Sequence, residues 1–150
     1  MKEPKRKFLP IKKILVPTDF TVYSDHAIEY AIMVGRKFQA KILLVHVIEP
    51  LTYSLTDTVQ IIDHYTALKT VAKPILENLQ KMILKKGLEA DILLLDGNPY
   101  LEIVKKSREA GVDLIIMGTH GRTGIEHILM GSVAERVVRL ASCPVVTVRG

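Results

Sequence analysis

Residues 114–132 read LIIMGTHGRTGIEHILMGS, and this stretch decides how the rest of the chain is interpreted. An apolar run typical of a buried strand, residues 114–117, passes directly into a loop that ends at the start of a helix near Ser132. The loop holds four of the nine glycines of the chain, Gly118, Gly121, Gly124 and Gly131. Glycine is used where the backbone takes unusual dihedral angles or comes close to another group, so we expect this loop to approach something closely.

Four more apolar runs resemble the one that precedes the loop. The five runs are residues 14–16, 42–47, 92–95, 114–117 and 145–148. Most are continuous rather than alternating, which is typical of strands that are buried on both faces of a parallel sheet.

The segments between these runs have helical periodicity. We predict helices from about residue 27 with Ser24 as N-cap, over 61–82, from Asn98-Pro99 to Gly111, and over 132–141. In the second helix, the apolar positions expected to face the core are 61, 65, 68, 72, 75, 79 and 82. The alternation of strands and helices predicts an α/β fold, a doubly wound five-stranded parallel sheet with helices on both faces. Residues 11–150 form this one domain, behind a basic tail of residues 1–10.

Ligands of doubly wound sheets bind beyond the C-terminal ends of the strands, and the glycine loop lies at such an end. The helix that follows offers unpaired N–H groups and a partial positive charge, both of which suit an anion. Gly118, Gly121 and Gly131 would let the backbone approach that anion. The loop contains neither the Gly-Lys-Ser/Thr of a Walker loop nor a G-x-G-x-x-G string.

The spacing Gly118-x-x-Gly121, nine residues, Gly131-Ser132 resembles the ATP-binding signature of the universal stress protein family. Four other strings resemble the same family: KKILVPTDF, ILLVHVIEP, DLIIMGTHGRTG and GSVAERVVRLASCPVVTVR. The resemblance covers about residues 11–150 and is weak over 51–85. It implies a Rossmann-like fold of the adenine nucleotide alpha hydrolase type.

The resemblance also implies a site for ATP or ADP with accompanying Mg²⁺. Asp19 would meet the ribose or phosphate side, Val47 and Met117 would form the adenine pocket, and the glycines would surround the ribose and phosphates. The implied contact residues are Pro17, Thr18, Asp19, Val47, Met117, Gly118, His120, Gly121, Arg122, Gly131, Ser132 and Val133. The family further implies a homodimer joined through the last strand, residues 145–148, which would otherwise be an exposed apolar edge.

Several of these residues have an alternative, structural interpretation. Ser132-x-x-Glu135 has the pattern of a capping box, in which the hydroxyl bonds its own helix. Asp19 could cap the next helix or brace neighbouring loops, and Arg122 could be a solvated cation. His46 is interpreted as a core histidine or a pocket wall. We expect no catalytic triad from His120, Asp19 and Ser132, because the G-x-S-x-G elbow is absent, and no metal-ligand cluster.

The chain carries a net charge of +5, but residues 1–13 hold six Lys/Arg and one Glu, so the excess lies in the tail. We therefore do not expect a nucleic-acid partner. No apolar stretch is long enough to cross a membrane, and a single cysteine, Cys143, suits the cytoplasm. The expected function is that of a nucleotide-dependent regulatory protein of the stress response, with at most slow ATP hydrolysis. The alternatives are a protein-interaction module without nucleotide and a nucleotide-processing enzyme.

Overall fold

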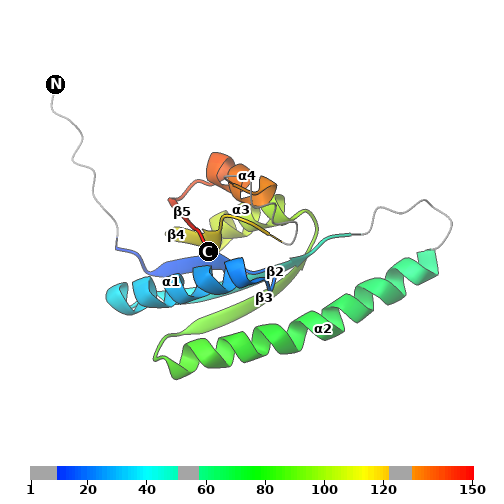
Figure 1. Ribbon diagram of the computed structural model, residues 1–150, viewed down its shortest axis with the longest axis horizontal. Coiled ribbons are helices and arrows are strands. Elements are labelled where there is room, and N and C mark those ends of the chain that lie inside the picture. The colour runs from blue at the N-terminus through cyan, green and yellow to red at the C-terminus, as the bar shows by residue number, and fades with distance from the viewer. Residues whose placement is uncertain (1–9, 51–57, 122–129) are drawn as a thin grey trace.

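The computed structural model describes residues 10–50, 58–121 and 130–150, with side chains from residue 64 onward in the second range. The elements are β1 (Lys13–Pro17), α1 (Val22–Phe38), β2 (Lys41–Ile48), α2 (Thr58–Lys85), β3 (Ala90–Asp96), α3 (Pro99–Glu109), β4 (Leu114–Gly118), α4 (Ser132–Leu140) and β5 (Val145–Val148). The strands form one parallel sheet in the order β3-β2-β1-β4-β5. Helices α1 and α2 cover one face and α3 and α4 the other (Figure 1). The predicted doubly wound α/β fold is confirmed.

Each face of the sheet has its own apolar core. On β1, Ile14 and Val16 belong to the core under α1 and α2, and Leu15 belongs to the core under α3 and α4. All three side chains are completely buried. Since successive side chains of a strand point to opposite faces, a strand covered on both sides needs apolar residues at every position. This is the physical reason for the continuous runs in the sequence.

Helix α1 begins earlier than the sequence predicts. Its N-cap is Thr21, so the expectation that Ser24 caps a helix from residue 27 is wrong. Ser24 is buried in the first turn, where its Oγ donates a hydrogen bond of 2.9 Å to the Thr21 carbonyl oxygen. The Asp19 carboxylate accepts hydrogen bonds from both the N–H and the hydroxyl of Thr21, and this turn starts the helix sooner.

Helix α2 was predicted in the right place with its buried face slightly rotated. Ile75 was expected in the core but is 37% exposed, whereas Leu76 and Ile83 are fully buried. The predicted positions repeat every 3.5 residues, but a straight helix turns every 3.6, so a seven-residue pattern drifts around the axis by about 20° in each repeat. The core contacts therefore move one position further along the chain.

Helix α3 begins where the sequence predicts. Asn98 is its N-cap and Pro99 its first residue, although the Asn98 side chain makes no capping hydrogen bond. The C-cap is Ala110 rather than Gly111, which follows it with φ of +61°. Glycine is favoured there because it reaches a positive φ without a steric penalty.

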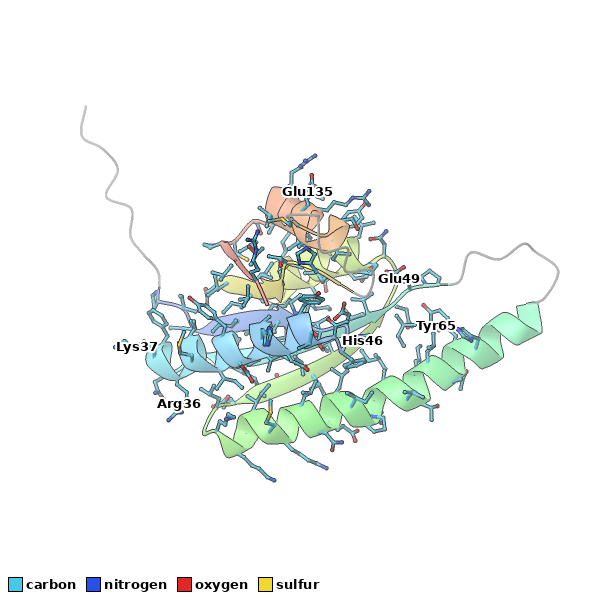
Figure 2. The ribbon with its side chains drawn as sticks, in the orientation of Figure 1. Arg36, Lys37, His46, Glu49, Tyr65 and Glu135 are labelled. Carbon is cyan, nitrogen blue, oxygen red and sulfur yellow. The ribbon has the colours of Figure 1, made fainter. Side chains whose placement is uncertain are left out.

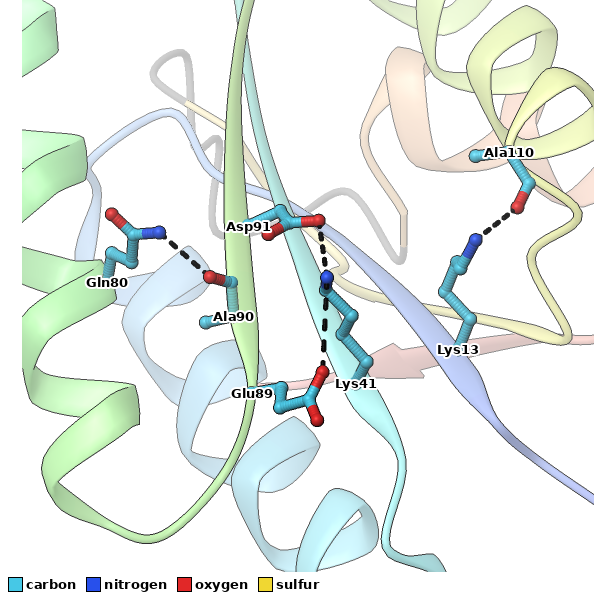
Figure 3. A network of polar contacts seen from close by, with 7 residues as sticks. All are labelled: Lys13, Lys41, Gln80, Glu89, Ala90, Asp91 and Ala110. Atoms are coloured by element: carbon cyan, nitrogen blue, oxygen red, sulfur yellow. Dashed lines mark hydrogen bonds and ion pairs between the residues drawn. The ribbon is translucent and has the colours of Figure 1, made fainter.

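Polar contacts tie the sheet together at the N-terminal ends of its strands (Figure 3). The Lys41 ammonium lies 2.7 Å from the Asp91 carboxylate and 4.0 Å from that of Glu89, and its hydrogen bond to Asp91 raises the pKa of Lys41. The Lys13 ammonium donates to the Ala110 carbonyl oxygen at 2.6 Å. A cavity of about 450 Å³ lies among these groups. Because the polar groups bond one another, we interpret this end of the sheet as structural.

Candidate functional site

A larger cavity, of about 630 Å³, lies over the C-terminal ends of β1, β2 and β4. The chain runs from β1 to β2 and β3 on one side and returns to β4 on the other side of β1, so the strand order reverses between β1 and β4. This is the point where doubly wound sheets bind ligands. The predicted contact residues that line the cavity are Pro17, Thr18, Asp19, Val47, Met117, Gly118, His120, Gly121, Gly131, Ser132 and Val133. Arg122 lies outside the described residues.

A chain of hydroxyl groups shapes the loop that follows β1. Ser24 Oγ donates to the Thr21 carbonyl oxygen, so Thr18 Oγ1, 3.0 Å away, donates to Ser24 Oγ. Thr18 Oγ1 in turn accepts the N–H of Phe20 at 3.1 Å. Thr18 and Ser24 are each only 4% exposed, so these bonds are shielded from water. They hold Phe20 at φ of +64°, a conformation that is rare for a bulky residue.

Asp19 is braced by its own loop and also faces the cavity. Its Oδ1 accepts the Thr21 N–H at 3.1 Å and the Thr21 hydroxyl at 2.6 Å. Its Oδ2 faces Gly121, where an added Cβ atom would come within 3.1 Å of it. The hydrogen bonds that orient Asp19 thus come from its own loop, at the N-cap of α1, and the carboxylate also lines the cavity.

His46 is a core histidine and a wall of the cavity, as expected. It is 5% exposed, and its Nδ1 donates to the Thr18 carbonyl oxygen at 2.7 Å. The Phe20 ring stacks on it with a centroid distance of 4.2 Å. The two rings thus lock the end of β2 to the loop after β1 (Figure 2 labels His46).

The structure gives the glycines of the loop a reason other than ligand approach. An added Cβ at Gly118 would lie 2.9 Å from the Tyr23 carbonyl oxygen, and one at Gly131 would lie 3.1 Å from the Thr119 carbonyl oxygen. Close packing is therefore a second reason for Gly118 and Gly131, beside the predicted approach of an anion, which stays a prediction. These glycines let the end of β4, the first turn of α1 and the start of α4 pack closely.

Helix α4 opens into the cavity without a side-chain cap. Its N-cap is Gly131, so Ser132 is the first helical residue and the predicted capping box does not form. The first hydrogen bond of the helix runs from the Glu135 N–H to the Gly131 carbonyl oxygen at 3.0 Å. The N–H groups of residues 132–134 precede it, have no intrahelical acceptor and belong to residues that line the cavity. This helix end is suited to a negatively charged group.

Three further contacts fix the β4–α4 connection on the cavity side. The Gly131 N–H donates to the Thr119 carbonyl oxygen at 2.6 Å, which ties the start of α4 to the end of β4. His120 Nδ1 lies 2.9 Å from Thr119 Oγ1, and its ring centroid is 5.4 Å from that of Tyr23. His120 therefore stands at the cavity wall in a fixed position.

Sequence reasoning missed the part of the site that comes from α2. His64, Leu68, Val71 and Ala72 line the cavity. The Tyr65 hydroxyl donates to the Ile48 carbonyl oxygen at 3.1 Å, and Lys69 pairs with Asp96 at 2.7 Å, so α2 is held beside the ends of β2 and β3 (Figure 2 labels Tyr65). Phe20 was also missed, although its place directly after Asp19 in PTDF was a usable signal.

Charge in the cavity is negative as far as the structure describes it. Asp19 and Glu49 line it, whereas no Lys or Arg of the described ranges does. Over the same residues, no three His, Cys, Asp or Glu side chains are grouped closely enough to hold a metal ion. No helix of the described part of the chain is both long and apolar enough to cross a membrane.

A parallel doubly wound sheet with a cavity at the switch point and a helix N-terminus in its wall defines a class of α/β ligand-binding proteins. Within that class, the chain belongs to the universal stress protein family, whose model matches residues 10–149. It is 36% identical over 141 residues to universal stress protein MJ0531 of Methanocaldococcus jannaschii, covering 92% of this chain and 82% of the relative.

Solved structures agree with this assignment. The structure of hypothetical protein MJ0577 has a TM-score of 0.87 at 32% identity, covering 95% of this chain and 98% of that one. A universal stress protein from Archaeoglobus fulgidus, solved in complex with dAMP, has a TM-score of 0.65 at 22% identity, covering 93% and 98%. At that identity the second likeness supports the fold.

Proposed function

We propose that this protein binds ATP or ADP with Mg²⁺ in the cavity and acts as a regulatory homodimer of the stress response. The observation that carries the proposal is the N-terminus of α4, which has no side-chain cap and opens into a cavity lined by the expected contact residues. Bound nucleotide would change the shape or the partners of the protein, with at most slow hydrolysis. The single cysteine, Cys143, suits the cytoplasmic location that we also propose.

The placement of the nucleotide follows from the chemistry of the wall. The phosphates would accept the N–H groups of Ser132 and Val133, where the helix end is positive. The adenine ring would lie against Val47 and Met117, and the Asp19 carboxylate would face the ribose. The dAMP held by the Archaeoglobus fulgidus neighbour is a nucleotide of the same adenine class.

Mg²⁺ would offset the repulsion between the nucleotide phosphates and the carboxylates of the cavity. Two carboxylates, Asp19 and Glu49, line the cavity, so the field from the described side chains disfavours a highly charged anion. When bound, Mg²⁺ neutralises phosphate charge, and it is commonly held by phosphate oxygens, water and one or two carboxylates. Asp19, which Thr21 orients and which would face the ribose, would hold such an ion through a bridging water. We therefore expect ATP to bind much more weakly when Mg²⁺ is chelated.

A thermal-shift titration of nucleotide-free protein tests the proposal. Binding to the folded state stabilises by about 2.7 kcal/mol at a hundredfold excess over Kd, so Mg-ATP should raise the melting temperature. GTP and ATP with EDTA should raise it less. Mass spectrometry of small molecules released from the denatured protein should find an adenine nucleotide. No shift at millimolar Mg-ATP would reject the proposal.

A specific observation favours one rival, an interaction module that binds no nucleotide. The close packing at Gly118 and Gly131 explains these two glycines without any ligand. It does not explain why an uncapped helix end opens into a cavity of about 630 Å³. The titration separates the two functions, because the module would melt at the same temperature with and without Mg-ATP.

A further inference from the structure

The cavity has two sides, separated by the plane of the sheet. Val47, Met117 and Val133 belong to the α3–α4 face, where we place the nucleotide. A second group of lining residues belongs to the opposite face or to α2. Phe20 packs against the core under α1 and α2, His46 and Ile48 alternate with Val47 along β2, and Leu68, Val71 and Ala72 lie on α2. We call this second group the α2 side of the cavity.

The α2 side is apolar in composition. Ile48 and Ala72 are buried, and Leu68 on α2 is half-buried. Val71 lines the cavity although it is 63% exposed, so part of this apolar wall faces water. Covering such a wall with an apolar group is favourable, in proportion to the area removed from water.

Phe20, the aromatic residue of this wall, is held in a backbone conformation that bulky residues disfavour. Phe20 has φ of +64°, and the buried hydroxyl groups of Thr18 and Ser24 keep it there. Its ring lies flat on His46, with an angle of 27° between the planes. A bulky residue held in a sparsely populated conformation is found disproportionately at ligand sites. The contacts therefore point to Phe20 as a residue positioned for a ligand.

We propose that the α2 side of the cavity binds an uncharged aryl group of one or two rings, with Phe20 as a specificity-determining residue. Aromatic ligands pair well with fixed aromatic and aliphatic walls. An anion is disfavoured because Asp19 and Glu49 line the cavity, and burying any charge against an apolar wall costs free energy, so the group is uncharged. The occupant is a small molecule rather than a protein surface, because the wall lies inside a cavity between α2 and the loop after β1.

N-phenyl-1-naphthylamine, an uncharged aryl amine that fluoresces in apolar surroundings, is the probe for the test. It should bind the wild-type protein saturably. Leu68→Ser should weaken binding by about tenfold or more, since it removes the apolar contact of a Leu side chain. Ile75→Ser is the matched control: Ile75 lies on the same helix and is 37% exposed, but does not line the cavity. It should leave binding within about twofold, as surface substitutions do.

Val71→Ser provides a second variant should Leu68→Ser fail to fold, because a residue that is 63% exposed tolerates the change. Val71→Ser should also weaken binding of the probe. Mg-ATP should leave the probe bound, because the nucleotide and the aryl group would occupy different sides of the cavity. The proposal is overturned if the wild-type protein does not bind the probe, if the α2 variants bind it as well as Ile75→Ser does, or if Mg-ATP displaces it competitively. The comparison of variants decides the matter even if ATP itself does not bind.

Discussion

Gly118 lies where the end of β4 passes the first turn of α1, and the two backbones are in contact there. An added Cβ atom would come within 2.9 Å of the Tyr23 carbonyl oxygen and 3.1 Å of its carbonyl carbon. Both are backbone atoms, which cannot move aside as the end of a flexible side chain can. A methyl group added at Gly118 would therefore have to push β4 and α1 apart.

Gly118→Ala should lower the free energy of unfolding by about 1–3 kcal/mol, because it overpacks this contact. Urea denaturation measures the loss. Gly111→Asn is the matched control, since Gly111 has φ of +61° with no atom within 4 Å of an added Cβ, and Asn tolerates this conformation. The control should stay close to wild-type stability. Equal stability of the Gly118 variant and wild type would contradict the close contact.

Cys143 illustrates how burial sets the chemistry of one residue. It is half-buried next to the α3–α4 core, and burial raises the pKa of its thiol. The thiolate is the nucleophile, so a raised pKa leaves less of it at neutral pH. We therefore interpret Cys143 as a structural residue.

At the scale of the element, the start of α4 shows whether Ser132 stabilises its own helix or binds a ligand. A capping box would make Ser132 important for stability, but Gly131 holds the cap position and Ser132 is the first helical residue. The Ser132 hydroxyl is therefore not needed to cap its own helix, and its place in the cavity wall gives it another use.

Ser132→Ala should change the free energy of unfolding by less than about 0.5 kcal/mol, as for a surface substitution. It should weaken ATP binding by about ten- to a hundredfold, because it removes a hydroxyl that would donate to a phosphate, and a hydrogen bond to a charged group contributes about 1.5–3 kcal/mol. Chemical denaturation and calorimetry measure the two effects.

Ser107→Ala serves as the control for that experiment. Ser107 is buried in α3, where its Oγ donates to the Val104 carbonyl oxygen at 2.7 Å, and it does not line the cavity. Its loss should affect stability and spare ATP binding. Wild-type ATP affinity in Ser132→Ala, together with a loss of stability above about 1 kcal/mol, would show that Ser132 acts as a cap after all.

At the scale of the whole molecule, β5 is the edge of the sheet next to β4, and its hydrogen-bonding groups alternate between two directions. The Pro144 and Val148 carbonyl oxygens accept N–H groups of β4 and of the residue after it. In a parallel ladder, alternate residues bond the same neighbour. Val145 and Thr147 therefore present their N–H and C=O groups at the open edge, where a second copy could pair with them.

Thr147→Pro should weaken the proposed homodimer, because it removes an N–H group from the open edge and leaves the bonds to β4 in place. Thr147→Ala is the control, since it removes the side chain but keeps that N–H. Light scattering across a concentration series should show a dimer for wild type and the control, and a shift towards monomer for Thr147→Pro. A monomeric wild-type protein at high concentration would refute the dimer.

The sequence predicted the order of the elements and one end of the site because those features are local. Continuous apolar runs at residues 14–16 and 114–117 identify strands buried on both faces, and Asp19 and Ser132 follow strand ends in the chain itself. Helix caps were less predictable. Ser24 and Ser132 both have the residue type of a cap, but the hydrogen bonds of Asp19 start α1 at an earlier residue, and Gly131 takes the cap position of α4.

The sequence by itself therefore determined the parallel α/β architecture, the family and the strand ends that carry the cavity, because periodicity and motif spacing are properties of neighbouring residues. The tertiary structure alone decided the rest. It placed Leu68 and Val71 of α2 in the same cavity wall as Phe20, brought Gly118 into contact with Tyr23, and turned the backbone N–H and C=O of Thr147 towards the open edge. Each depends on how one element is rotated and seated against another far away in the chain, and no local pattern records that.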